Sequence, residues 1–146
     1  MSKNKIAVIG YGYWGKNHAR VLNELGVLSG IYDLEVSNDK DSPYYFFSSI
    51  DEVVNSSNAA IIATPATTHY SIAHKLISDL DLLIEKPMSM SSSECDDLLY
   101  KSKKSGKLII VGHQLHFHPA ILKIKDYVNS DILGNIKWIY SNRLNM

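Results

Sequence analysis

The sequence contains very little cysteine, no excess of charge of either sign and no long apolar segment. Cys95 is the only cysteine in 146 residues, so no internal disulfide can form and no zinc-type Cys or Cys/His spacing occurs. Fifteen Lys+Arg balance fifteen Asp+Glu, which removes the net field that draws basic proteins to nucleic acid or anionic membranes. The start has no signal-peptide core, and no run reaches the roughly 18 apolar residues of a membrane span. These absences predict a cytoplasmic protein without nucleic-acid or membrane partners, in which local structure binds any anionic ligand.

Short apolar runs alternate with segments of helical periodicity, which is typical of βαβ units around a parallel sheet. Residues 34–43 are polar and lack an apolar stripe, so a loop or a single turn should replace the crossover helix before the aromatic run 44–47. The pattern predicts a doubly wound parallel α/β sheet of about six strands. The expected strands are 5–9, 27–32, 59–63, 81–84, 108–111 and 135–144, and the expected helices with their caps are 14–25, 49–54, 68–77, 91–106 and 120–128.

A glycine pattern joins the first expected strand to the first helix. Gly10, Gly12 and Gly15 match G-x-G-x-x-G, and their position between a buried strand and an amphipathic helix makes this short pattern informative. Gly10 suits a tight turn, Gly12 lets the backbone approach a pyrophosphate, and Gly15 lets the helix pack close to the strand. The helix N-terminus then presents N–H groups to the phosphates. The loop predicts a Rossmann-type dinucleotide site.

Asp33 is the residue that selects the cofactor. It closes the second expected strand eighteen residues after Gly15, and its carboxylate can accept both ribose hydroxyls of an adenosine. The same carboxylate would repel a 2′-phosphate, so the sequence predicts NAD rather than NADP. The alternative is a Rossmann-like domain with a merely tight turn and a solvated Asp33.

Beyond this loop, the motifs resemble those of the Gfo/Idh/MocA oxidoreductases, a family of NAD(P)-dependent sugar and sugar-nucleotide dehydrogenases. The resemblance rests on the order and spacing of the glycine loop, Asp33, Ala63-Thr64-Pro65 with His69, Glu85-Lys86-Pro87, and Val111-Gly112-His113 followed by His118-Pro119-Ala120. The ending at 140–145 is most similar to the branch that oxidises C3 of UDP-activated N-acetyl sugars or uronates for surface polysaccharides. The resemblance implies NAD as cofactor and a sugar or sugar-nucleotide alcohol as substrate.

The resemblance implies that Lys86 is the catalytic residue of this chain. It would lie beside the nicotinamide and the substrate hydroxyl, where its ammonium could orient the alcohol, stabilise a developing alkoxide or take part in deprotonation. Without the family match, an exposed loop lysine beside a proline is the simpler interpretation. Pro87 restricts Lys86 to extended dihedral angles, and the peptide bond between them could be cis.

The other expected cofactor contacts also come from the resemblance. Thr64 and Pro65 end a strand, where open α/β sheets bind ligands, although an ordinary turn is an equal alternative for these two residues. The Tyr13 ring could lie against the cofactor, while the simplest place for Trp14 is the core. The full set of expected contacts is Gly10, Gly12, Tyr13, Trp14, Gly15, Asp33, Thr64, Pro65, His69, Glu85, Lys86 and His113.

A metal site at His113, His116 and His118 is disfavoured, because no carboxylate or thiol accompanies these histidines. His113 and His118 instead match family positions that face the substrate or the nicotinamide. Gln114 and His116 depart from the Asn and Arg that are commonest in the family, which puts the substrate contacts in doubt and leaves the glycine loop unaffected. We expect no metal ion.

The resemblance spans nearly the whole chain but only the first half of such an enzyme. It implies an NAD-binding domain over 1–119, followed at 120–146 by the last helix and first strand of a truncated substrate domain. The Asp and His that the second domain supplies in the family have no counterpart here, so we expect weak or no activity from this chain alone. The alternatives are a non-enzymatic module that binds NAD or another adenine nucleotide as a regulatory ligand, and a decayed gene fragment.

The expected terminal strand predicts a protein partner. Ile136, Trp138 and Tyr140 would alternate onto one face of that strand, and without a second domain the face and the strand edge stay open. We therefore expect either a homo-oligomer or a partner that supplies the missing sheet.

Overall fold

The computed structural model describes residues 4–36 and 42–142. The chain divides into two compact units, Met1–Gly112 and His113–Met146, each with its own internal contacts. We describe each unit by itself. The expected boundary after residue 119 stays a prediction.

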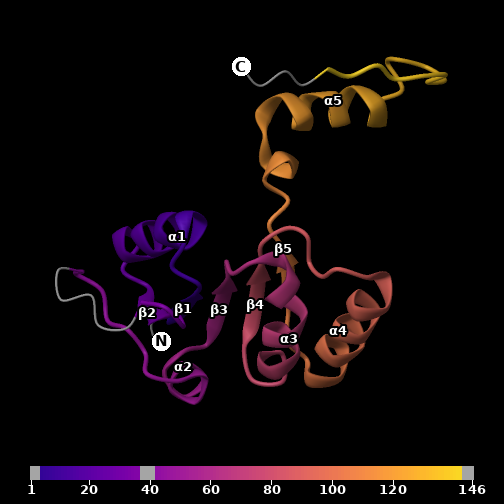
Figure 1. The fold of residues 1–146 in the computed structure, drawn as a ribbon. Helices are drawn as coiled ribbons and strands as arrows, with labels where there is room; N and C mark the ends of the chain where they lie inside the picture. Colours follow the sequence, from indigo (N-terminus) through magenta and orange to yellow (C-terminus); the bar gives the residue numbers. More distant parts are fainter. Residues whose placement is uncertain (1–3, 37–41, 143–146) are drawn as a thin grey trace. The chain divides into compact units, whose positions relative to one another are not determined.

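The first unit holds one parallel sheet with helices between its strands (Figure 1). Its strand order is β2-β1-β3-β4-β5, so the chain turns back across β1 and the direction of winding reverses between β1 and β3. The expected doubly wound α/β fold is confirmed. In chain order the elements are β1 (Ile6–Ile9), α1 (Tyr13–Glu24), β2 (Leu28–Tyr32), α2 (Ile50–Ser56), β3 (Ala59–Ile62), α3 (Ala66–Leu76), β4 (Asp81–Ile84), α4 (Ser92–Ser105) and β5 (Ile109–Val111).

The third βα unit is reduced to a single bridge. Phe46 pairs in parallel with Ile31 of β2, and the bridge is made by hydrogen bonds from Ile31 N–H to the Tyr45 carbonyl (2.9 Å) and from Phe47 N–H to the Ile31 carbonyl (2.7 Å). This segment occupies the sheet edge beside β2, where a classic Rossmann sheet has its third strand. The described part of the polar connection forms no helix, as expected, while residues 37–41 lie outside the described residues.

One hydrogen bond fastens this edge segment to α2. The Tyr45 hydroxyl donates to the Glu52 carboxylate, which also accepts from the Ser48 N–H (2.7 Å) and the Ser48 hydroxyl (2.9 Å). These donors lower the pKa of the Glu52 carboxyl, with the Tyr45 hydroxyl contributing most. The Glu52 side chain therefore holds the edge segment to α2 in addition to the single β-bridge.

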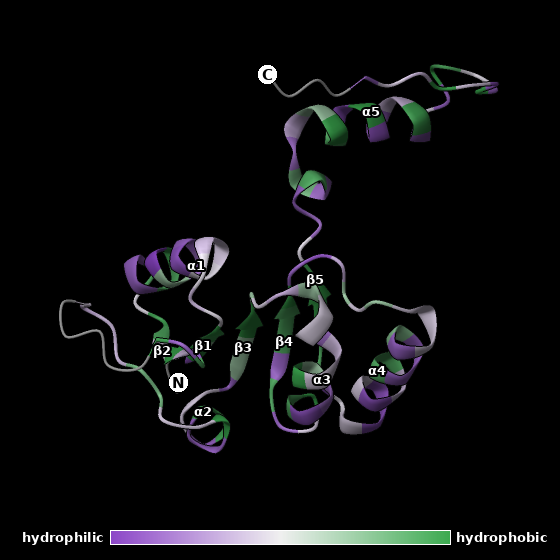
Figure 2. Cartoon of the chain, viewed as in Figure 1, coloured by the Kyte–Doolittle hydropathy of each residue, from purple (hydrophilic) through white to green (hydrophobic). Residues whose placement is uncertain are grey.

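Both faces of the sheet are covered near its centre, which explains why the strands are apolar along their whole length. Ala7 and Ile9 of β1 pack into a core with α2, α3 and α4, whereas Val8 between them packs into a second core with α1 and Phe46. In Figure 2 the arrows of β3, β4 and β5 are largely green, whereas α1 and α4 carry both purple and green segments. At the other edge, Ile110 of β5 is exposed within this unit.

Three of the expected helix ranges begin at a predicted N-cap: Ser49, Thr68 and Ser91. Two of these three N-caps are confirmed. Ser49 and Ser91 are the N-caps of α2 and α4, and their hydroxyls accept from the N–H of Glu52 (3.2 Å) and Glu94 (3.3 Å). Thr68 is not a cap, because α3 begins at Ala66 after Pro65. The Thr68 hydroxyl is already bound inside the first turn, where it donates to the Pro65 carbonyl (2.7 Å).

The second unit contains a 3₁₀ turn, η1 (Gln114–Phe117), and α5 (Pro119–Asn129). The strand expected over 135–144 is not formed in its described part, since residues 135–142 make no ladder, and residues 143–146 lie outside the described residues. A strand needs a neighbour for its N–H and C=O groups, and none pairs with this segment among the described residues. Trp138, Ile139 and Tyr140 are all exposed, so the expected alternation is also absent.

No helix in the described ranges combines the length and apolar character needed to cross a bilayer.

The contact between α1 and the glycine loop predicts that Gly15→Ala destabilises the fold. A Cβ at Gly15 would lie 1.8 Å from the Gly10 carbonyl oxygen, which belongs to the backbone and cannot rotate away. We expect a loss of about 1–3 kcal/mol in the free energy of unfolding, the usual cost of overpacking, measured by urea denaturation.

Gly12→Ala is the matched control, because a Cβ there meets nothing within 4 Å. Its free energy of unfolding should fall by only about 0.5–1 kcal/mol, less than for Gly15→Ala, because alanine is a poorer N-cap than glycine but meets no backbone there. Equal stability of the two variants would contradict the close packing of α1 on the loop.

Candidate functional site

The three loop glycines divide into two that pack and one that leaves space. Gly10 has a φ of 92°, and a Cβ there would lie 2.8 Å from the Ala63 carbonyl oxygen. Gly15 lies against Gly10, whereas Gly12 faces open space. Gly12 is also the N-cap of α1 and contributes no side-chain cap. The first turn of α1 therefore begins beside a space that a Cβ would narrow, an arrangement that fits a pyrophosphate group.

Asp33 joins the glycine loop to the end of β2. Its Oδ2 accepts from the Tyr11 N–H (2.6 Å), and its Oδ1 accepts from the N–H groups of Glu35 (2.8 Å) and Val36 (3.1 Å). A carboxylate has about four acceptor positions, and these bonds use three of them. The carboxylate therefore keeps room for about one ligand hydroxyl, which is fewer than the two that the sequence suggested.

A cavity of about 590 Å³ opens at the carboxyl ends of β1, β2 and β3. This volume is within the range of small-molecule sites, and the position is the reversal point of the sheet, where open α/β folds bind ligands. Five of the expected contact residues line it: Gly10, Gly12, Asp33, Thr64 and Pro65. The other lining residues are Ile9, Tyr32, Leu34, Glu35, Ile50, Ala63, Thr68, Ser71, Ile72 and Lys75.

The α3 side of this cavity was not expected from the sequence. Thr68, Ser71, Ile72 and Lys75 follow Thr64 at helical spacing and form one stripe of α3. That spacing was visible in the sequence. Once Thr64 and Pro65 are placed at the crevice, the same face of the following helix is its natural wall.

Tyr13 and Trp14 are not among the residues that line the cavity. Tyr13 is 77% and Trp14 45% exposed, so the expectation that Trp14 packs in the core is wrong. Their rings meet edge to face with centroids 5.3 Å apart, and Asn17 Nδ2 donates to the Tyr13 carbonyl (3.0 Å). Both residues occupy the first turn of α1, whose buried side is instead formed by Gly15, Ala19 and Leu22.

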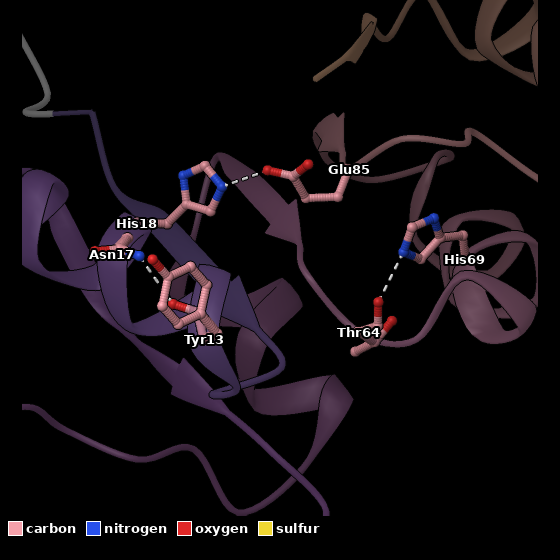
Figure 3. A network of polar contacts seen from close by, with 6 residues as sticks. All are labelled: Tyr13, Asn17, His18, Thr64, His69 and Glu85. Atoms are coloured by element: carbon pink, nitrogen blue, oxygen red, sulfur yellow. Dashed lines mark hydrogen bonds and ion pairs between the residues drawn. The ribbon is translucent and has the colours of Figure 1, made fainter. Parts of the chain in front are cut away.

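The end of β4 carries a second group of expected site residues (Figure 3). Glu85 is buried, and its Oε1 lies 2.9 Å from Nε2 of His18 on α1. Lys86 is exposed, and its peptide bond to Pro87 is cis, one of the two forms considered from the sequence. His69 is buried and bonds to the carbonyl oxygens of Thr64 and Pro87, so its ring does not line the cavity.

His113 and His118 belong to the second unit. His113 precedes η1, and His118 is the N-cap of α5, where its Nδ1 accepts from the Ala120 N–H (3.2 Å). Their expected contacts with nicotinamide or substrate stay predictions.

Another cavity, of about 410 Å³, lies at the amino ends of β1 and β2. Lys5, Ser29 and Glu52 are among its lining residues. None of the site residues expected from the sequence lines it.

Comparison with curated proteins gives relatives whose names describe several sugar-related reactions. The chain is 26% identical over 145 residues to UDP-N-acetylglucosamine 3-dehydrogenase of Acidithiobacillus ferrooxidans, an alignment covering 96% of this chain and 45% of the relative. It is 26% identical to glucose-6-phosphate 3-dehydrogenase of Bacillus subtilis (90% and 40% covered) and 25% identical to 2,7-anhydro-N-acetylneuraminate hydratase of Mediterraneibacter gnavus (94% and 38%). The chain thus spans less than half the length of these relatives.

Solved structures agree on the fold. A structure of UDP-N-acetylglucosamine 3-dehydrogenase from Acidithiobacillus ferrooxidans matches with a TM-score of 0.79 at 27% identity, covering 86% of this chain and 42% of that chain. GenD2 from gentamicin A biosynthesis, solved in complex with NAD, matches with a TM-score of 0.79 at 23% identity, covering 90% and 40%, and this likeness concerns the fold alone.

The family comparison is consistent with the geometry of the loop. Residues 4–113 match a family described as an oxidoreductase family with an NAD-binding Rossmann fold. This match contains the glycine loop, Asp33, the Thr64–Pro65 turn and Glu85-Lys86-Pro87. The chain therefore belongs to the Gfo/Idh/MocA oxidoreductase family, and its first unit contains the NAD-binding Rossmann domain of that family.

Proposed function

We propose that this chain is the NAD-binding part of an enzyme that transfers a hydride between a sugar or sugar-nucleotide alcohol and NAD. The observation that carries the proposal is the cavity itself, which has open space at Gly12 beside the start of α1 at one side and Asp33 at another. The cofactor supplies the hydride acceptor, and the chain supplies binding and orientation. The names of two relatives, both sugar 3-dehydrogenases, support a sugar substrate.

Lys86 is the catalytic residue in this proposal. It is exposed and follows β4 directly, so its ammonium is free to approach a substrate hydroxyl and to stabilise the negative charge that develops as the proton leaves. It does not line the cavity of the first unit. In this proposal catalysis requires further protein around Lys86, in line with the expectation of weak or absent activity from the 146 residues alone.

A regulatory module that binds NAD without turnover is the second candidate. It is favoured by the absence of Lys86 from the residues that line the cavity. The two functions differ in one measurable respect: a sugar nucleotide should change NAD affinity or nicotinamide fluorescence only if the chain is part of a dehydrogenase.

NAD should bind more tightly than NADP, and Asp33→Asn should narrow that difference. The Asp33 carboxylate repels a 2′-phosphate, and the neutral amide removes that repulsion. We expect NAD to bind at least about tenfold more tightly in the unmodified chain, a difference of about 1.4 kcal/mol, measured by calorimetry with both cofactors.

Asp79→Asn is the control for this test. It makes the same charge change at an exposed carboxylate that does not line the cavity, so the NAD to NADP ratio should stay as it is. A preference for NADP in the unmodified chain would contradict the proposed cofactor selectivity.

Lys86→Ala should leave NAD affinity unchanged and abolish turnover. Affinity is measured on the 146-residue chain by calorimetry, and turnover is measured with a second polypeptide that supplies the missing substrate domain. We expect a loss of at least about 100-fold in kcat, the usual contribution of a positioned acid or base. The exposed Lys104 of α4 provides a control substitution, Lys104→Ala. Full turnover in Lys86→Ala would exclude the catalytic role.

The chain should self-associate or bind a partner that covers its exposed apolar residues. In the second unit, Ile132, Trp138, Ile139 and Tyr140 are each at least 69% exposed. Light scattering at increasing protein concentration should show a rising mean mass, and Trp138→Ser should reduce the rise because it removes a large exposed apolar group. A monodisperse monomer at high concentration would contradict self-association.

A further inference from the structure

The ring of His69 bridges the ends of two neighbouring strands. His69 belongs to α3 and is 1% exposed. Its Nδ1 lies 2.7 Å from the carbonyl oxygen of Pro87. Its Nε2 lies 2.9 Å from the carbonyl oxygen of Thr64 (Figure 3). Thr64 follows β3 and lines the cavity, whereas Pro87 follows β4 and is bonded directly to Lys86.

This bridge begins where the ladder between the two strands stops. The last register pair of β3 and β4 is Ile62 with Ile84, and the Glu85 N–H donates to the Ile62 carbonyl (2.9 Å). Beyond this pair, β3 continues into the Thr64–Pro65 turn and β4 continues into the Lys86–Pro87 segment. The His69 ring therefore continues the connection past the end of the sheet.

The ring joins the two segments because each of its nitrogens lies within hydrogen-bond distance of a backbone carbonyl oxygen. An imidazole always carries hydrogen on at least one nitrogen, so at least one of the two contacts is a hydrogen bond from His69 to a carbonyl at a strand end. Together the two contacts hold the buried ring between the strand ends.

The ring of His69 contacts two backbone carbonyl oxygens rather than the charged side chains of the surrounding elements. On β4, the Glu85 carboxylate is bonded to His18 and Lys86 is exposed. On α3, the neighbouring charged side chain Lys75 lines the cavity. The Thr64 and Pro87 carbonyl oxygens are the acceptors that the structure shows on the ring.

We propose that His69 is a positioning residue whose buried ring, held between two backbone carbonyl oxygens, fixes the Thr64 wall of the cofactor cavity relative to the backbone that carries Lys86. The link to Lys86 rests on the proposed function, whereas the two contacts of the ring do not. In this arrangement a change at the cavity wall is transmitted to the catalytic lysine through one side chain.

The first test is backbone nuclear magnetic resonance relaxation of the full 146-residue chain at neutral pH without cofactor. We expect the amides of Thr64 and Lys86 to have order parameters as high as those of β3 and β4, although both residues lie beyond the last register pair of the two strands. Order parameters typical of a flexible loop at Thr64 and Lys86 would overturn the proposal.

The second test compares His69→Phe and His69→Gln with His74→Phe as the matched control. Phenylalanine removes both ring nitrogens, and glutamine can reach one carbonyl. We expect His69→Phe to weaken NAD affinity about tenfold and to lower the backbone order parameter of Lys86, with His69→Gln in between. His74→Phe should leave both quantities unchanged. Unchanged affinity and an unchanged Lys86 order parameter in His69→Phe would overturn the positioning role.

The two tests separate this inference from the proposed function. If the unmodified chain binds no NAD, the proposed function fails while the relaxation measurement still decides whether the strand ends are held. If His69→Phe does not fold, the relaxation measurement and the His69→Gln variant decide the inference.

Discussion

The close approach of α1 to the glycine loop is the constraint on which the rest of the site depends. Gly15 lies so near the Gly10 carbonyl that no side chain fits between them, and Gly10 in turn lies against Ala63 at the end of β3. These two contacts fix the start of α1 at the reversal point of the sheet. The unpaired N–H groups and the partial positive charge of the helix start are therefore placed at the cavity without any basic side chain in the loop segment itself.

Asp33 adds a second constraint, and it acts on the protein before it acts on a ligand. Its carboxylate accepts N–H groups from the glycine loop and from the chain after β2, so it holds the two sides of the cavity together. A neutral replacement would weaken these charge-assisted bonds as well as the discrimination against a 2′-phosphate. Cofactor selectivity and loop geometry are thus coupled in one side chain, and a substitution there changes both.

Much of the sheet could be predicted because each strand is indicated by the residues of its own segment. Apolar runs bounded by glycine or polar residues mark β1 to β5, and the capping serines mark α2 and α4. The glycine loop was equally predictable, since its requirement is steric. The terminal strand was not, because a strand exists only with a neighbour and the sequence does not show whether one is present. Trp14 was misplaced because its helical spacing suggested a buried position, whereas the buried side of α1 is formed by Gly15, Ala19 and Leu22.

The cofactor end and the reactive end of the site are built by different physics. Backbone packing of glycines shapes the first, so a short motif suffices to predict it. Side-chain bonds between distant segments shape the second, with His18 on α1 meeting Glu85 and His69 on α3 meeting both strand ends. Those bonds could not be predicted from spacing, because the partners are brought together only by the folded sheet. Binding of NAD can therefore be an intrinsic property of the first unit, whereas the catalytic role proposed for Lys86 depends on what encloses that side chain.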